Sequence, residues 1–243
     1  MNKPEMILFD WGNTLATGGF DGVAGTRAVL NSSHNPNNVT AEEVQAFADK
    51  INRECGREYG YNVKELTAEI HNHPFQRYLY EYFGVEFDIS QDEVEEIFWS
   101  NANPVHNTEG IEEFLRFLKS ENIRTGVISN ISFTEKALAR RINSMLPDNE
   151  FEFIIASSEY VFRKPNGRLF ELALRKAGIT ADKAWYCGDN VNCDVIGAYN
   201  AGITPVWYTG DMDGKQTPPP FECITVSKWK ELKEILLKVH TTV

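Results

Sequence analysis

The second half of the chain alternates short apolar runs with longer amphipathic segments, and this pattern constrains the fold most strongly. The apolar runs are 124–129 (RTGVIS), 151–157 (FEFIIAS), 183–189 (KAWYCGD) and 204–210 (TPVWYTG). The amphipathic segments between them are 133–146, 166–178 and 191–202. Such alternation predicts βαβ units, in which helices cover both faces of a parallel sheet. The run 6–10 (MILFD) predicts one more strand of that sheet.

The segment 18–104 has a different pattern, with helix signals and no clear strand. Two capping boxes mark helix starts, Thr40 with Glu43 and Ser90 with Glu93. Apolar residues recur at helical spacing between these starts, at Phe75, Leu79, Tyr82 and Phe83. We therefore predict an all-helical insert after the first strand, from which the chain returns through a helix at about 108–121.

These patterns predict one α/β fold, a Rossmann-like three-layer sandwich with a mostly parallel sheet and an inserted helical domain. The predicted core domain comprises residues 1–17 and 105–243, and the predicted helical cap comprises 18–104. The chain has 243 residues, of which 42% are hydrophobic and 12% aromatic, so it can bury a substantial core.

Charge and cysteine usage narrow the possible partners. The formal net charge of −11 disfavours non-specific binding to nucleic acid or to anionic membranes. The four cysteines form no CxxC pair, which favours reduced thiols and a cytoplasmic location. We find no signal-peptide pattern and no apolar run of the roughly 20 residues that a membrane helix needs. The oligomeric state, monomer or homodimer, is not readable from the sequence.

Polar residues follow each predicted strand at the edge where parallel sheets bind ligands. Asp10 ends the first run, Ser129 and Asn130 end the second, and Lys164 follows the third. Asp189 ends the fourth, with Asp194 five residues later. Three carboxylates, a hydroxyl and an ammonium group can thus share one rim.

A cluster of carboxylates needs a cation. Two carboxylates ~4 Å apart repel by about 4 kcal/mol at an effective dielectric of 20. Because the ligands would be oxygens, with no histidine or cysteine pattern, Mg²⁺ is the natural choice. Together with Lys164 and Ser129, the ion would make a receptor for a phosphoryl group, and so for a small phosphorylated substrate.

At this point the sequence resembles the haloacid dehalogenase (HAD) superfamily. The family pattern is DxDx[TV], then Ser or Thr, then Lys, then GDxxxxD. The matching residues are Asp10 to Thr14 (DWGNT), Ser129, Lys164 with Pro165, and Gly188-Asp189 with Asp194. The order of these motifs and the helical insert after the first of them extend the resemblance over nearly the whole chain.

The resemblance implies a role for each residue. Asp10 is the expected nucleophile, with Thr14 supporting its loop, and the expected Mg²⁺ ligands are Asp10, Asp189, Asp194 and the backbone carbonyl of Gly12. Ser129 and Lys164 would stabilise charge on the phosphoryl group. The expected substrate contacts are Ser129, Asn130, Lys164 and Trp11.

Gly12 departs from the pattern of the phosphatase members, which usually carry a second Asp at this position. That Asp protonates the leaving group and then activates water. General acid–base help is typically worth 10²–10⁴-fold, or roughly 3–5 kcal/mol. We therefore expect a slow or selective phosphohydrolase.

Two alternatives stay open. One is a hydrolase similar to phosphonoacetaldehyde hydrolase, a branch with a small residue at this position and a Schiff-base lysine in the insert, here Lys50 or Lys64. That branch tends to lack the lysine found here as Lys164. The other alternative is a non-catalytic phosphate-binding protein. A dehalogenase works without metal, and the intact GDNVNCD motif (188–194) disfavours that activity.

Overall fold

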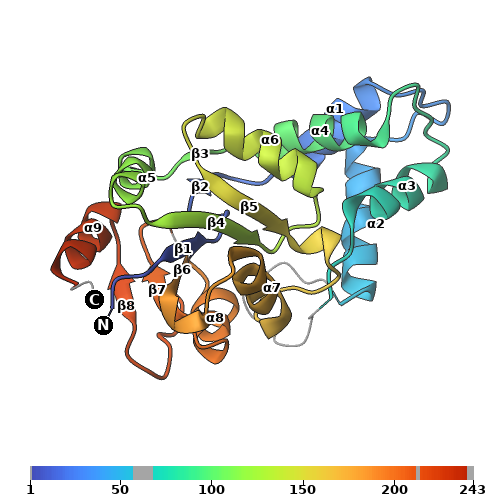
Figure 1. The fold of residues 1–243 in the computed structure, drawn as a ribbon. Coiled ribbons are helices and arrows are strands. Elements are labelled where there is room, and N and C mark those ends of the chain that lie inside the picture. Colours follow the sequence, from blue (N-terminus) through green and yellow to red (C-terminus); the bar gives the residue numbers. More distant parts are fainter. Residues whose placement is uncertain (1, 57–67, 212–213, 240–243) are drawn as a thin grey trace.

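The structure is a computed structural model that describes residues 2–56, 68–211 and 214–239. Its centre is a six-stranded sheet in the order β5-β4-β1-β6-β7-β8, with every pair of neighbours parallel (Figure 1). The strands are β1 (Met6–Phe9), β4 (Arg124–Ser129), β5 (Phe151–Ala156), β6 (Ala184–Gly188), β7 (Thr204–Tyr208) and β8 (Ile224–Val226). The predicted α/β class and parallel sheet are confirmed.

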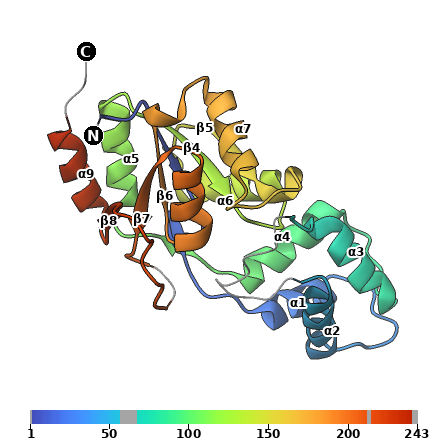
Figure 2. The same cartoon turned by 90° about the horizontal axis from the view of Figure 1, so that it is seen from below.

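Helices cover both faces of this sheet, which makes the three layers (Figure 2). One face packs against α5 (Ile111–Ser120), α6 (Glu135–Met145) and α9 (Trp229–Lys238). The other face packs against α7 (Gly167–Ala177) and α8 (Gly197–Asn200). Strand β1 shows the reason, because Ile7 and Phe9 point to the first layer while Met6 and Leu8 point to the second. All four side chains are fully buried.

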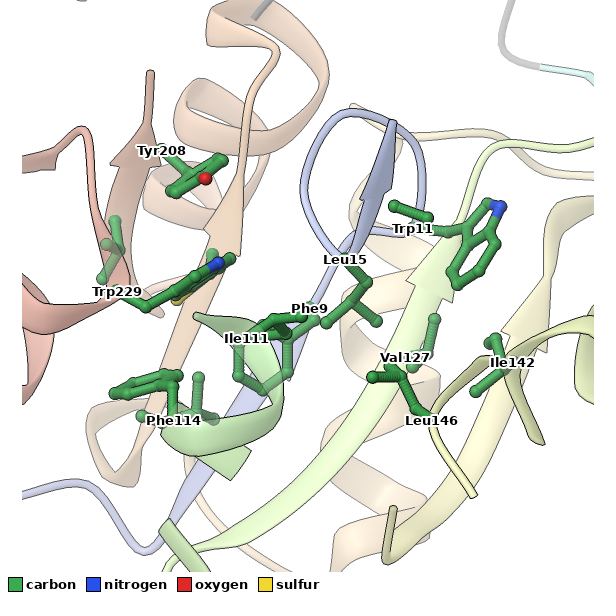
Figure 3. Close-up of a cluster of buried hydrophobic side chains, with 14 of the residues drawn as sticks. Phe9, Trp11, Leu15, Ile111, Phe114, Val127, Ile142, Leu146, Tyr208 and Trp229 are labelled. Carbon is green, nitrogen blue, oxygen red and sulfur yellow. The ribbon is translucent and has the colours of Figure 1, made fainter. Parts of the chain in front are cut away.

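The core on the α5–α9 face is rich in aromatic residues (Figure 3). Trp229 stacks on Tyr208 with ring centroids 4.4 Å apart and on Phe114 at 5.3 Å. The same cluster includes Trp11, Ile142 and Leu146, which Figure 3 labels. Packing of this kind fixes the loop that leaves β1, because Trp11 anchors it directly after Asp10.

The segment 18–104 contains α1 (Gly22–Asn31), α2 (Ala41–Glu54), α3 (Asn72–Tyr82) and α4 (Gln91–Ala102), and the part that the structure describes has no strand. Both predicted capping boxes are present, Thr40 with Glu43 and Ser90 with Glu93. The helices bury a cluster of their own beside the sheet domain (Figure 1). Tyr82 is 59% exposed rather than buried, although its ring stacks on Phe47.

Two short strands, β2 (Ala16–Thr17) and β3 (His106–Asn107), flank segment 18–104 in the sequence and pair in antiparallel fashion. The division into 1–17 with 105–243 and 18–104 stays a prediction.

The sequence analysis did not predict the short strands β2 and β3, and two further elements differ from it. Strand β8 was not predicted, because its three residues follow a proline-rich loop and offer too short a run to show a period. The helix predicted at 191–202 is divided into a π-helical turn, η3 (Val191–Ile196), and the short α8. None of the described helices is both long and apolar enough to span a membrane.

Candidate active site

Strand β1 lies at the point where the order in which strands are added to the sheet reverses. From β1 the chain builds outward through β4 and β5, and then returns to β6 on the other side. Ligands bind beyond the carboxyl ends of the strands at such a point. Asp10 directly follows β1, Ser129 is the last residue of β4, and Asp189 directly follows β6.

Lys164 links two of the carboxylates at this edge. Its Nζ donates to Oδ1 of Asp10 at 2.7 Å and to Oδ1 of Asp194 at 2.6 Å. The lysine is 2% exposed. Burial alone would lower the pKa of Lys164, but the charges of Asp10 and Asp194 outweigh it and raise the pKa, so the ammonium form persists. A buried lysine is held here as a fixed positive charge.

Asp194 is positioned by the turn that follows β6. Its Oδ2 accepts the backbone N–H of Asn190 at 2.9 Å, within the start of η3. A Cβ added to Gly188 would lie 2.3 Å from Cγ of Asp194, closer than real Cβ atoms approach. The glycine of the GD pair is therefore required by close packing, because any side chain there would displace Asp194.

The three carboxylates fit a cation. Asp10, Asp189 and Asp194 each offer an oxygen within 4.8 Å of the others. Oδ2 of Asp189 is buried without a hydrogen-bond partner among the described residues. Burial and the charges of Asp194 and Asp10 raise the pKa of Asp189 to about 8. Since an orphaned buried oxygen among like charges is costly, this donor set suits a hard divalent ion.

Asp10 has an environment suited to attack. It is 8% exposed, and burial raises its pKa to about 6, with Lys164 opposing the rise and Asp194 adding to it. A pKa of about 6 leaves the carboxylate largely ionised at neutral pH. The backbone N–H of Asp10 donates to the carbonyl of Cys187 at 2.8 Å, which extends the β1–β6 pairing to the site.

The next residues of the first motif lie in different surroundings. The side chain of Trp11 is 4% exposed and packs in the core. Gly12 is exposed, and an added Cβ would meet no atom within 4 Å. Thr14 is fully buried, and its backbone carbonyl accepts from Thr108 Oγ1 at 2.8 Å.

Ser129 ends β4, and Asn130, which follows it, contacts Lys164. Ser129 is 3% exposed. The side chain of Asn130 accepts from the backbone N–H of Lys164 at 2.7 Å and donates to its carbonyl at 2.8 Å. The amide of Asn130 therefore holds the backbone of Lys164. The parts that Ser129, Asn130 and Trp11 take in substrate binding stay predictions.

Tyr186 was missed by the sequence analysis. Its hydroxyl accepts from Lys164 Nζ at 2.6 Å and donates to the carbonyl of Ile128 at 2.9 Å. The only available signal was a tyrosine in a fully buried strand, where a hydroxyl needs a partner. Gln216 was missed as well, and its side chain donates to the carbonyl of Asp189 at 3.1 Å and accepts from Val191 at 2.8 Å.

Comparison with known proteins agrees with this geometry. The family model of the haloacid dehalogenase-like hydrolases matches residues 4–202. A glyceraldehyde 3-phosphate phosphatase of Methanothermobacter thermautotrophicus is 29% identical over 217 residues, which cover 86% of this chain and 87% of the relative.

Solved structures agree on the fold. A 2-haloacid dehalogenase from Pseudomonas syringae pv. Tomato superimposes with a TM-score of 0.67 at 22% identity, covering 98% of this chain and 99% of that one. An HAD phosphatase from Thermococcus onnurineus gives a TM-score of 0.63 at 18% identity, covering 97% of this chain and 98% of that one. At these identities the likeness concerns the fold alone.

Proposed function

This chain belongs to the haloacid dehalogenase-like hydrolase family, and we propose that it is a Mg²⁺-dependent phosphohydrolase acting through an aspartyl-phosphate on Asp10. The substrate is a small phosphorylated metabolite. One observation carries the proposal, the convergence of Asp10, Asp189 and Asp194 on Lys164 at the carboxyl edge of the sheet. The phosphatase named above, similar over most of both chains, supports the same reaction class.

The metal would be held by the carboxylates of Asp10, Asp189 and Asp194, with the backbone carbonyl of Gly12 as the further ligand expected from the family pattern. When bound, the ion supplies positive charge that draws the phosphoryl group toward Asp10 and offsets its negative charge. The buried Oδ2 of Asp189, without a described hydrogen-bond partner, supports this assignment.

In the proposed reaction, a carboxylate oxygen of Asp10 attacks phosphorus and the bond to the leaving oxygen breaks. Water then hydrolyses the aspartyl-phosphate, which restores Asp10 and releases phosphate. Lys164 orients the carboxylate through its 2.7 Å hydrogen bond and offsets charge on the phosphoryl group. Ser129, at the end of β4, is the proposed side-chain donor to a phosphoryl oxygen.

Leaving-group protonation sets the selectivity. At position 12 the chain offers no side chain, so no carboxylic acid there can protonate the departing oxygen. Leaving groups that depart readily as anions, such as aryl or acyl oxyanions, need little such help. We therefore expect faster turnover of aryl and acyl phosphates than of alkyl phosphates.

The test is phosphate release from a panel of phosphate esters and anhydrides, including glyceraldehyde 3-phosphate, with and without Mg²⁺. Wild type should release phosphate only with the metal, and Asp10→Asn should reduce release to the uncatalysed background. Equal release by wild type and Asp10→Asn would favour a non-catalytic phosphate-binding protein instead. A cytoplasmic location and a monomeric or homodimeric state stay predictions.

The phosphonoacetaldehyde hydrolase-like alternative needs a lysine that forms an imine. The side chain of Lys50 on α2 is 63% exposed, and its Nζ lies 3.9 Å from Oε1 of Glu54. An imine-forming lysine is instead typically desolvated. Lys64 lies outside the described residues. Borohydride trapping with phosphonoacetaldehyde should leave both lysines unmodified, whereas a trapped adduct at either would support the alternative.

A further inference from the structure

A buried carboxylate of the helical segment, Glu69, contacts both loops that carry the polar residues of the proposed site. We propose that Glu69 is a positioning residue, which fixes the position of the loop after β4 relative to the loop that carries Lys164. This inference rests on the phosphohydrolase proposed above, since it assigns Glu69 a part in building that site.

The side-chain contacts of Glu69 reach one residue from the catalytic lysine. Its side chain is fully buried, and Oε2 accepts from Nη1 of Arg163 at 2.6 Å. Arg163 directly precedes Lys164 in the chain. Charge-assisted hydrogen bonds are the stronger class, and a buried carboxylate with a guanidinium partner resists displacement. The position of Arg163 is thereby tied to the helical segment.

The same oxygen reaches the other loop through a serine. Oε2 of Glu69 accepts from Oγ of Ser157 at 2.7 Å, and that Oγ accepts the backbone N–H of Ile131 at 2.8 Å. Ile131 lies two residues after Ser129, and Ser157 is fully buried. One carboxylate oxygen therefore connects Arg163 with the backbone that follows the proposed phosphoryl-binding serine.

Backbone contacts fix the position of Glu69 itself. Its N–H donates to the carbonyl of Val161 at 2.5 Å, and Ala68 pairs with Phe162 in an antiparallel bridge. Val161 has a φ of 67°, a conformation that β-branched residues rarely adopt. A turn with such a residue persists when its surroundings hold it. Segment 68–69 supplies that support directly before Lys164.

A second buried glutamate of the helical segment provides a matched control. Glu95 on α4 is fully buried and also contacts a hydroxyl of the sheet domain, since it accepts from the backbone N–H and Oγ1 of Thr134 at 3.1 and 2.5 Å. Thr134 caps the start of α6. Glu95 thus ties the helical segment to a helix, whereas Glu69 ties it to the site loops.

The experiment compares hydrogen exchange in full-length wild type, Glu69→Gln and Glu95→Gln by mass spectrometry. In Glu69→Gln, peptides covering 129–132 and 162–165 should exchange roughly 10- to 100-fold faster. Arg163 loses its charged partner, and Ser157, which accepts the N–H of Ile131, loses the carboxylate that orients its hydroxyl. Glu95→Gln should instead affect peptides at the start of α6. Unchanged exchange at both loops in Glu69→Gln, or equal loosening of them in Glu95→Gln, would overturn the proposal.

Two milder variants separate the arms of the contact and replace Glu69→Gln if it fails to fold. Ser157→Ala should speed exchange at 129–132 alone, and Arg163→Gln should speed exchange at 162–165 alone. If neither variant speeds exchange at its loop, the proposal is contradicted.

Turnover gives the functional readout. At a temperature where all variants are folded, Glu69→Gln should lower kcat/KM for an aryl phosphate roughly 10- to 100-fold, mostly through kcat, and Glu95→Gln should leave it within about twofold. Equal kcat/KM in Glu69→Gln and wild type would overturn the positioning role. If wild type shows no Asp10-dependent turnover, the phosphohydrolase proposal fails, and the exchange data alone still decide whether Glu69 holds the loops.

Discussion

Gly12 is the position at which one substitution should add chemistry rather than remove it. Its backbone has no left-handed φ, the residue is exposed, and a Cβ built on it meets no atom within 4 Å. An aspartate there needs no rearrangement of the loop. We predict that Gly12→Asp supplies the missing general acid and raises turnover of alkyl phosphates.

The size of the gain follows from the proton transfer. General acid–base catalysis typically contributes 10²–10⁴-fold, equivalent to roughly 3–5 kcal/mol of barrier. The new carboxyl group would lie two residues from Asp10, where repulsion by the site carboxylates raises its pKa and the charges of Lys164 and the bound cation oppose that rise.

The assay is kcat for a matched pair of substrates, an alkyl phosphate and an aryl phosphate, at saturating Mg²⁺. Gly12→Asp should raise kcat for the alkyl ester by about 100-fold or more, and far less for the aryl ester, whose leaving group needs no proton. Gly12→Asn is the control, because it has the same shape and cannot donate a carboxyl proton. If the two variants have the same kcat on the alkyl ester, the reasoning about the missing acid is refuted.

Three further predictions concern the buried charges. Because burial raises the pKa of Asp189 from 3.8 to about 8, the metal-free fold loses stability as pH rises from about 4 to about 8. The Tm gain from saturating Mg²⁺ should therefore be larger at about pH 9 than at about pH 6, and Asp189→Asn should reduce this difference. Gly188→Ala should cost about 1–3 kcal/mol in urea unfolding and weaken Mg²⁺ binding measured by calorimetry, because its methyl group collides with Asp194. Tyr186→Phe removes one acceptor of Lys164 and should lower kcat roughly 2- to 10-fold while leaving the Mg²⁺ affinity unchanged.

The placement of the site carboxylates was predictable because it depends on a rule of sheet geometry. Asp10 and Asp189 each follow a strongly apolar strand, and strands of a parallel sheet end at a common edge. Both glutamate capping boxes were predictable for a similar reason, since they are formed within one turn of chain. Local patterns and the general geometry of parallel sheets suffice for such features.

The supporting contacts were not predictable, because they join residues far apart in the sequence. Tyr186 reaches Lys164 across 22 positions, and Glu69 reaches Arg163 across 94. Nothing in the local sequence distinguishes these side chains from other buried or charged residues. Trp11 illustrates the opposite difficulty, since its neighbour in the chain is the proposed nucleophile while its own ring packs in the hydrophobic core.

The charges at the sheet edge do not serve the stability of the metal-free fold. Lys164 offsets Asp10 and Asp194 together, which leaves one excess negative charge before Asp189 is counted. Asp189 then adds a buried carboxylate with an oxygen that lacks a described partner. Burying a carboxylate in this way costs free energy, which the fold recovers only if the group takes up a proton or a cation. A chain selected for stability alone would place an amide or an apolar residue there, so the arrangement is best explained by the need to hold a cation beside Asp10.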